Sequence, residues 1–355
     1  MGLTLSDVIT STPSAWGAAN ATSAAVVYPL AAFVAVPLVA VVSDPAQMWH
    51  AGQRYGHVAE HIRTAIEEIS QAVDRHASAD HWREEGRNAF VANRVKPYQD
   101  TLGQAAGMYD NVRDTLWGCA IGYTVAGLSS AVIGSAVLGY VASLLAAAVV
   151  PGVDVATTYV ANARMVEALQ VVRTLISGLA KVNGVAWSIL GRITAEIGAL
   201  PVATAVGTGV SAYYIGAKAE PSFEKTQTTL NWPQRLKSGA AVPSGYRAPS
   251  AADQDAIKKI APASITALGK DLDLGPARTL ADAYDQAQGN DVGYPGFGAV
   301  GLHLAHAHSV MRDHAAQQLA ACRDTPGTWL PGLRSCSDTW VFAEHASVDA
   351  TKHDK

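Results

Sequence analysis

The sequence of 355 residues predicts an all-α protein, and three observations lead to this prediction. Hydrophobic residues make up 49% of the chain, which is enough to bury cores at this length. Ala and Gly are plentiful, whereas runs of the branched and aromatic residues that favour strands are sparse. Apolar residues also recur at alternating spacings of three and four, which is the period of helices packed along a seam.

Residues 1–43 form an apolar N-terminal segment, which Pro29 and Pro37 interrupt. Conventional signal peptides begin with basic residues and end at a cleavage site of small residues. The opening stretch MGLTLSDVITSTPSAW contains no Lys or Arg. We therefore expect any export to depend on another kind of signal. The protein is expected to be secreted or associated with the cell envelope without a conventional signal peptide.

Residues 44–118 predict an antiparallel helical hairpin. Between Pro45 and Ala77 one helix face carries the apolar residues Tyr55, Ala59, Ile62, Ile66, Ile69 and Val73. A second helix up to Leu116 repeats the spacing in Val91, Val95, Tyr98, Leu102, Ala105, Tyr109, Val112 and Leu116. Pro97 is expected to kink its first turns. About a dozen residues join the helices, with Asp80 as an N-cap, so the two stripes are expected to pack on each other.

Residues 119–218 predict apolar helices rich in small residues. No charged residue occurs from 115 to 153, and a bilayer span requires roughly 20 apolar residues. Small residues recur every fourth position along a helix-packing ridge made of Gly127, Ala131, Ser135, Gly139, Ser143 and Ala147. Such a ridge permits close helix contact in lipid or in water, so membrane insertion stays open. A long amphipathic helix is expected at 154–197, followed by an almost charge-free stretch at 197–217.

Residues 219–250 carry four prolines and little periodicity, which predicts a linker. A C-terminal helical module follows at 251–347, with short helices expected near 251–261 and 276–289, and a frayed tail follows at 348–355. Prolines 326 and 331 are expected to disturb the last helix. Cys322 and Cys336 flank these prolines, so a disulfide forms only if the segment is a loop. In a continuous helix the two residues stand about 21 Å apart.

The turn of the predicted hairpin carries the sequence HWREEGRNAF, residues 81–90. Trp82 lies eight residues before Phe90, with Gly86 and Ala89 between them. This register resembles the WXG superfamily of type VII secretion substrates, helical hairpins with W-x-G at the tip and an aromatic residue eight places after the Trp. Glu84 departs from the family, because it stands where the family has Gly. The alternative is an ordinary hairpin with Trp82 in its core.

The C-terminal stretch that begins PGFGAVGLHLAHAH resembles the carboxy-terminal half of EspC-like proteins associated with ESX secretion, in which an F-G-x-x-G turn opens a long helix. Families exported by this route often end with Tyr followed by an acidic residue four places on. Trp340 and Glu344 match that spacing with Trp in place of Tyr, which makes them the candidate export signal. The alternative is an exposed Glu beside a packing Trp.

Neither metal binding nor catalysis is expected. The stretch HVAEH, residues 57–61, matches the H-x-x-E-H zinc motif, but no Glu occurs between Glu85 and Glu167 to supply a further ligand. His303, His306 and His314 share a helix face that could sense pH, although a partly exposed polar face is the simpler interpretation. No cofactor is expected. A net charge of −4 leaves no broad basic surface, so nucleic acid is not an expected partner.

Three functions are consistent with these observations. The first is a type VII, ESX-like secretion-associated helical protein that acts through helix–helix interaction with a WXG-like protein, a secretion chaperone or itself. The second is a membrane-inserting or pore-forming effector built on residues 119–217. The third is a toxin with an unrecognised enzyme domain at the C-terminus. The Trp82 turn and the candidate signal at Trp340 and Glu344 favour the first.

Overall fold

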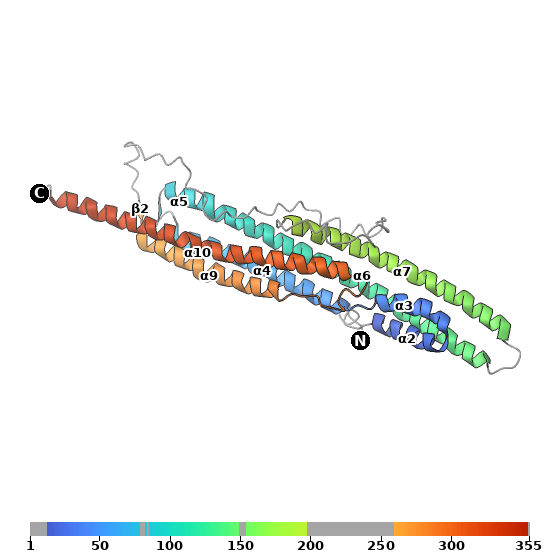
Figure 1. Cartoon of the computed structure of the whole chain (residues 1–355). Helices are drawn as coiled ribbons and strands as arrows, with labels where there is room; N and C mark the ends of the chain where they lie inside the picture. The colour runs from blue at the N-terminus through green and yellow to red at the C-terminus, as the bar shows by residue number, and fades with distance from the viewer. Residues whose placement is uncertain (1–12, 79–81, 84, 149–153, 197–258, 354–355) are drawn as a thin grey trace. The chain divides into compact units, whose positions relative to one another are not determined.

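The computed structural model describes residues 13–78, 82–83, 85–148, 154–196 and 259–353. Within these ranges the protein is all-α, as the sequence predicts. Figure 1 shows the helices α2 (Pro13–Val27), α3 (Ala32–Ala40), α4 (Pro45–His76), α5 (Glu85–Phe90), α6 (Lys96–Ala148), α7 (Asp154–Glu196), α9 (Pro262–Gln288) and α10 (Leu302–His353). A 3-10 turn, η1 (Pro29–Ala31), precedes α3, and a π-helical segment, η2 (Val91–Val95), precedes α6. Two short strands, β1 (Trp82–Arg83) and β2 (Lys259–Ile260), pair antiparallel.

The chain folds into two compact units, each assembled from segments that are distant in sequence. Unit 1 comprises residues 1–56, 110–229 and 290–314. Unit 2 comprises residues 57–109, 230–289 and 315–355. This division differs from the predicted one, because residues 44–118 and 251–347 each contribute to both units.

In unit 2, α9 runs antiparallel along the 57–76 part of α4. Thr279 Oγ1 donates a hydrogen bond of 2.8 Å to the carboxylate of Glu68. Two helical turns further along, Gln286 Nε2 lies 3.1 Å from the His61 ring nitrogen Nε2. Residue numbers therefore rise along α9 while those of their partners fall along α4. The predicted C-terminal module thus buries its first helix on the predicted hairpin.

The other two helical segments of unit 2 belong to α6 and α10. Gln99 Nε2 on α6 donates to Ser70 Oγ on α4 at 2.8 Å. A Cβ atom built on Gly269 of α9 would lie 2.5 Å from a methyl carbon of Leu330 on α10, so these helices are in close contact. Tyr98 on α6 also contacts the backbone of α10 at Cys322. Each of the four segments therefore touches two neighbours, as in an antiparallel four-helix bundle.

Helix α10 continues through Pro326 and Pro331, which corrects the expected interruption. Proline has no N–H, so Pro326 leaves the carbonyl of Cys322, four residues before it, without its helical donor. Tyr98 Oη on α6 donates to that carbonyl at 2.7 Å. The freed acceptor is thereby satisfied within the core of unit 2, which explains why the helix tolerates this proline. Because the helix is continuous, Cys322 cannot reach Cys336, and Cys322 is a free buried thiol.

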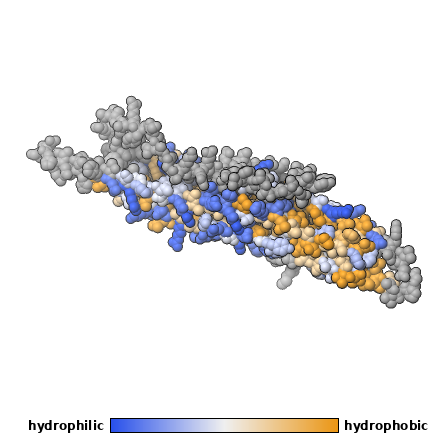
Figure 2. All heavy atoms as spheres, viewed as in Figure 1, coloured by the Kyte–Doolittle hydropathy of each residue, from blue (hydrophilic) through white to orange (hydrophobic). Residues whose placement is uncertain are grey.

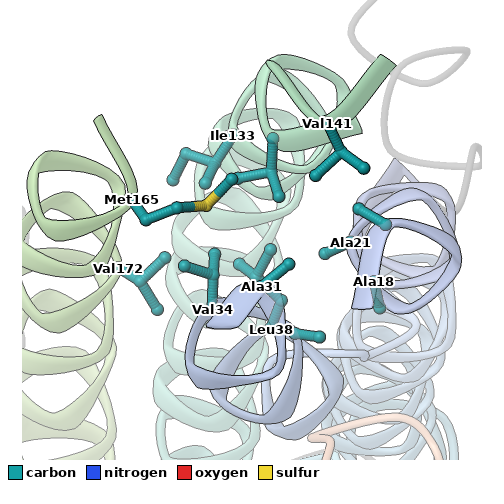
Figure 3. Packing of buried hydrophobic residues seen from close by; sticks show 12 residues of the cluster. Ala18, Ala21, Ala31, Val34, Leu38, Ile133, Val141, Met165 and Val172 are labelled. Atoms are coloured by element: carbon teal, nitrogen blue, oxygen red, sulfur yellow. The ribbon is translucent and has the colours of Figure 1, made fainter. Parts of the chain in front are cut away.

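In unit 1, α7 returns antiparallel along α6, and α2 lies parallel to α6. Tyr123 Oη on α6 bonds Asn183 Oδ1 on α7 at 2.9 Å. Helix α3 packs on both α2 and α7. Figure 3 shows the core between these four helices, formed by Ala18, Ala21, Ala24, Ala31, Val34, Ala35, Leu38, Ile133, Val137, Val141, Met165 and Val172.

Candidate membrane-contacting surface

Helix α3 and the turn before it are apolar on every side. Residues 29–42 read PLAAFVAVPLVAVV, without one polar side chain. One face is in the core of unit 1, where Ala31, Val34 and Leu38 are fully buried. The opposite face is open, because Phe33 is 65% and Val36 is 70% exposed. A helix that is apolar all round is normally enclosed by protein or lipid, and α3 is enclosed on one side only.

A second apolar stripe runs along the α6 part of unit 1. Its members lie three or four residues apart and are Ile121, Val125, Leu128 and Val132, with exposed fractions between 45% and 71%. Trp16, Val26 and Val27 on and beside α2 are also at least half exposed. Figure 2 shows apolar surface gathered over α2, α3 and the neighbouring part of α6. Transfer of one such side chain from water to an apolar environment is favourable by about 1.5–3 kcal/mol.

Small residues line the contact between α2 and α6. A Cβ built on Gly134 of α6 would lie 2.0 Å from the carbonyl oxygen of Gly17 on α2, so two backbones meet without side chains between them. Asn20 Nδ2 on α2 donates to Ser135 Oγ at 3.1 Å beside this contact. Helices that pack in lipid have small residues between them and large apolar residues on the outside, because lipid solvates the outer face.

Within the part of the chain that the structure describes, two segments are long and apolar enough to cross a membrane, judged by length and composition alone. They lie within residues 29–76 and 87–147, and 39% and 28% of their most apolar windows are buried. The core helix of a water-soluble protein meets the same length criterion but is mostly buried. Fewer than half of the residues in each window are buried.

Charged and aromatic groups border the apolar part of α6. The Trp49 and Trp117 rings stack with centroids 4.9 Å apart, and the Arg113 guanidinium lies 5.2 Å from the Trp117 ring centroid. Arg113 also pairs with Asp110 and Asp114 at 2.8 and 2.9 Å. Trp residues beside charges are typical of the boundary between membrane and water. The charge-free stretch of α6 begins immediately after Asp114.

Helix α7 gives unit 1 a charged side. Arg164 and Glu167 form an exposed ion pair at 2.8 Å, and Arg173 is exposed further along the helix. A fully enclosing bilayer would have to desolvate these charges, which is unfavourable by several kcal/mol. The arrangement therefore fits a protein that places α2, α3 and the apolar stripe of α6 in the interface rather than one that is surrounded by lipid.

The predicted ridge on α6 divides into two parts. Gly127 packs against Pro13 and Ser14 at the beginning of α2, and the backbone of Ala131 packs against Gly17. Ser135 is exposed but accepts a hydrogen bond from Asn20 of α2, whereas Gly139 and Ser143 are exposed and Ala147 is half-buried. The first part of the ridge therefore contacts α2, a helix that the sequence analysis left within an unassigned apolar segment. The absence of charge between Asp7 and Asp44 was the available signal.

The predicted hairpin tip belongs to unit 2. Trp82 is 5% exposed and stacks on Phe90 with ring centroids 6.0 Å apart. Phe90 also meets the ring of Trp329 edge to face at 5.8 Å. Gly86 lies in α5, whereas Glu84 lies outside the described residues. Phe90 thus lies between the Trp82 indole and the Trp329 ring of α10.

The candidate export residues Trp340 and Glu344 lie on the backbone of α10, but their side chains lie outside the described part of the chain. In the HVAEH stretch, His57 is exposed and His61 contacts Gln286. Among the described residues no group of three His, Cys, Asp or Glu side chains is placed to hold a metal ion.

A buried histidine that sequence analysis did not single out lies near the beginning of α10. His308 is fully buried, and its Nε2 atom lies 3.1 Å from Tyr55 Oη. Desolvation lowers its pKa to about 4, with a further lowering from the charge of Arg312. Its neighbour in sequence, His306, is exposed. Helical spacing places His308 on the same face as Leu304 and Met311, and His306 on another face, which is the signal that separates these two histidines.

No family model, curated protein or solved structure matches the chain.

Proposed function

We propose that this chain is a membrane-binding helical effector whose unit 1 places α2, α3 and the exposed stripe of α6 in a lipid bilayer interface. The observation that carries the proposal is the open face of α3 and of the turn before it. Leu30, Phe33, Val36 and Val39 are exposed there, and no polar residue occurs from 29 to 42. Interfaces between proteins normally include polar groups at their rim. A purely apolar helix face suits hydrocarbon better than a protein partner.

The expected mode is interfacial insertion. Helix α2 has 15 residues and α3 has 9, so they reach about 22 and 14 Å. The hydrocarbon core of a bilayer is about 30 Å thick, so neither helix alone crosses it. The α2–α3 hairpin is therefore expected to enter one leaflet, with the charged side of α7 towards water.

Val36→Glu tests this proposal, and Leu274→Glu is its matched control. Val36 is 70% exposed on α3 and Leu274 is 69% exposed on α9, so neither substitution disturbs a core. In flotation of the full chain with phosphatidylcholine and phosphatidylglycerol vesicles, Val36→Glu should reduce binding at least about tenfold, because a charge in the apolar interface is unfavourable by more than 1.4 kcal/mol. Leu274→Glu should bind like the unaltered protein. Equal binding by both variants would contradict the proposal.

The second proposal is export through a type VII, ESX-like system, with helix–helix contact to a WXG-like partner, a secretion chaperone or a second copy. The packing of Trp82 at the turn between α4 and α6 supports it, because an indole at that position is the feature that the chain shares with the WXG superfamily. Double substitution of Trp340 and Glu344 with Ala should reduce secretion into the medium. Arg334→Ala, on the same helix, should not. Unchanged secretion after deletion of the system's ATPase would contradict this route.

A C-terminal enzyme domain is not proposed, because α9 and α10 share their cores with residues from the first half of the chain.

A further inference from the structure

A strap of residues 290–301 lies against the corner between α3 and α4 in unit 1. The Asp44 N–H donates to the carbonyl of Gly296 at 3.0 Å, and the Val300 N–H donates to the carbonyl of Ala40 at 3.3 Å. Gly298 has a φ of 61°, and a Cβ there would lie 2.5 Å from the carbonyl oxygen of Val42. The strap is therefore in backbone contact with the end of the helix that carries the apolar face.

Phe297 anchors this strap beside the buried histidine. Its side chain is 1% exposed, and its ring centroid lies 6.1 Å from that of His308. His308 Nε2 is bonded to Tyr55 Oη, whereas Nδ1 has no hydrogen-bond partner. A neutral ring has one N–H and one acceptor nitrogen, so the present packing leaves one ring nitrogen without a partner but holds no charge. Protonation would add a second N–H inside an apolar pocket without an acceptor, which is unfavourable.

The charged groups around His308 come from α10 and from the strap. Arg312 lies one turn later on α10 and pairs with Asp291 of the strap at 2.9 Å and with Asp313 at 2.8 Å. Burial is the main cause of the lowered pKa of His308, followed by the charge of Arg312. Asp291 and Asp313 act in the opposite direction and offset part of this lowering. Tyr55 from α4 completes the set of titratable groups that face the ring.

We infer that the strap is an acid-sensitive latch: when His308 takes up a proton, Phe297 leaves its pocket, the strap releases the α3–α4 corner, and the α2–α3 hairpin moves from α6 into the bilayer. This inference rests on the proposed membrane function and adds its regulation. Binding through the exposed face needs no acid, whereas deep insertion requires the latch to open.

The pH range follows from the two states of the ring. In an opened latch His308 is hydrated and titrates near its ordinary pKa of about 6.5, whereas in the closed latch its pKa is about 4. The open state therefore gains protons first as the pH falls from about 6.5 towards 4. At about pH 5 the ratio of open to closed latch should be about 20-fold larger than at neutral pH.

Leakage of a dye from phosphatidylcholine and phosphatidylglycerol vesicles tests the latch. The unaltered full chain should float with vesicles at neutral pH without leakage and should release dye at about pH 5. His308→Gln keeps a polar group for Tyr55 but takes up no proton, so it should bind at neutral pH and lose the acid-dependent leakage. His306→Gln, at the exposed position on the same helix, should leak like the unaltered protein, and so should His303→Gln.

A reversible lock tests the movement of the hairpin. A Cβ built on Gly127 lies 3.5 Å from the Cβ of Ser14, which is within the range of a disulfide. The Ser14→Cys, Gly127→Cys protein should bind vesicles when oxidised and leak at about pH 5 only after a phosphine reductant is added. Its reduced form is the matched control for the two substitutions.

The outcomes separate the two proposals. Failure of the unaltered protein to float at neutral pH contradicts the membrane function itself. Flotation with leakage that is independent of pH, an acid step that survives in His308→Gln, or equal leakage from the oxidised lock contradicts the latch alone. If His308→Gln does not fold, amide hydrogen exchange of the unaltered protein decides. After correction for intrinsic rates, residues 290–301 should lose protection at about pH 5, and unchanged protection would overturn the latch.

Discussion

The surroundings of a side chain, rather than its residue type, determine whether it is buried in this protein. His308 and His306 lie two residues apart on α10, yet one ring is fully buried and the other is exposed. Trp82 is 5% exposed in unit 2, whereas Trp16 is 63% exposed on α2 of unit 1. These pairs permit predictions in which each residue is compared with a control of the same kind.

The first prediction concerns the pH dependence of stability. The folded-state pKa of His308 is about 4, below its ordinary value, so the unfolded state binds the proton more readily. The contribution of His308 to the free energy of unfolding is constant above about pH 6.5, and this free energy falls as the pH decreases from there towards 4. The loss at about pH 5 should be about 2 kcal/mol larger in the unaltered protein than in His308→Gln. Urea unfolding of both proteins at the two pH values measures the difference, and parallel losses would contradict the burial of an uncharged ring.

The second prediction compares the two tryptophans. Trp82→Ala should destabilise unit 2 by about 3–5 kcal/mol, because it removes a buried ring stacked on Phe90. Trp16→Ala should change stability by less than about 0.5 kcal/mol, since its ring is mostly in solvent. Urea midpoints monitored by circular dichroism give both values. A Trp82→Ala protein as stable as Trp16→Ala would show that the turn does not depend on the indole.

At the scale of helices, two glycines of α6 have different neighbours. Gly134 meets the backbone of Gly17 on α2, whereas Gly139, five residues later, has no atom within 4 Å of a built Cβ. A methyl group at the first position must therefore separate two helices. At the second position it meets nothing and only restricts the unfolded chain.

The third prediction follows from this contrast. Gly134→Ala should destabilise the α2–α6 contact by about 1–3 kcal/mol through overpacking. Gly139→Ala should stabilise α6 by about 0.5–1 kcal/mol, because Ala is the better helix former. Hydrogen exchange of α2 amides reports the first effect and thermal unfolding reports the second. Equal behaviour of the two variants would mean that α2 does not pack at Gly134.

The sequence specified helices better than it specified their partners. The seam from Tyr55 to Val73 predicted a helix at 45–77, and α4 ends at His76. The second seam placed a helix from 91, where the structure has a π-helical segment before α6, next to Pro97. Proline removes a donor, and a wider turn accommodates the change. The continuity of α10 was not predictable, because it depends on the hydroxyl of Tyr98, more than two hundred residues away.

At the scale of the whole chain, periodicity did not reveal which helices share a core. The apolar faces of α9 and α10 match any antiparallel neighbour of similar length, so the sequence suggested a separate module. In the structure they complete unit 2 with residues 57–109. The exposure of the apolar face of α3 could not be predicted either, because a charge-free segment has the same sequence pattern whether its outer side contacts protein, lipid or water. Only the burial of one side and the exposure of the other identifies the candidate surface.

The two units therefore have different surfaces and different expected roles. Unit 1 carries the open apolar face and the strap, and unit 2 carries the Trp82 turn and the helical segment with Trp340 and Glu344. The proposed membrane contact therefore involves the first unit, and the residues of the proposed export route lie in the second. Substitutions in α3 should consequently leave secretion unchanged.

The most direct measurement of membrane contact is a nitroxide spin label at Val36, compared with one at Leu274. Both sites are equally exposed, at 70% and 69%. The labels can be introduced as cysteines in a Cys336→Ser background, because Cys119 and Cys322 are buried and burial raises the pKa of Cys322 to about 12. On addition of vesicles, the label at Val36 should gain access to oxygen and lose access to a water-soluble nickel complex, while the label at Leu274 keeps its access to both. Continued access of the nickel complex to Val36 in vesicle-bound protein would contradict the account.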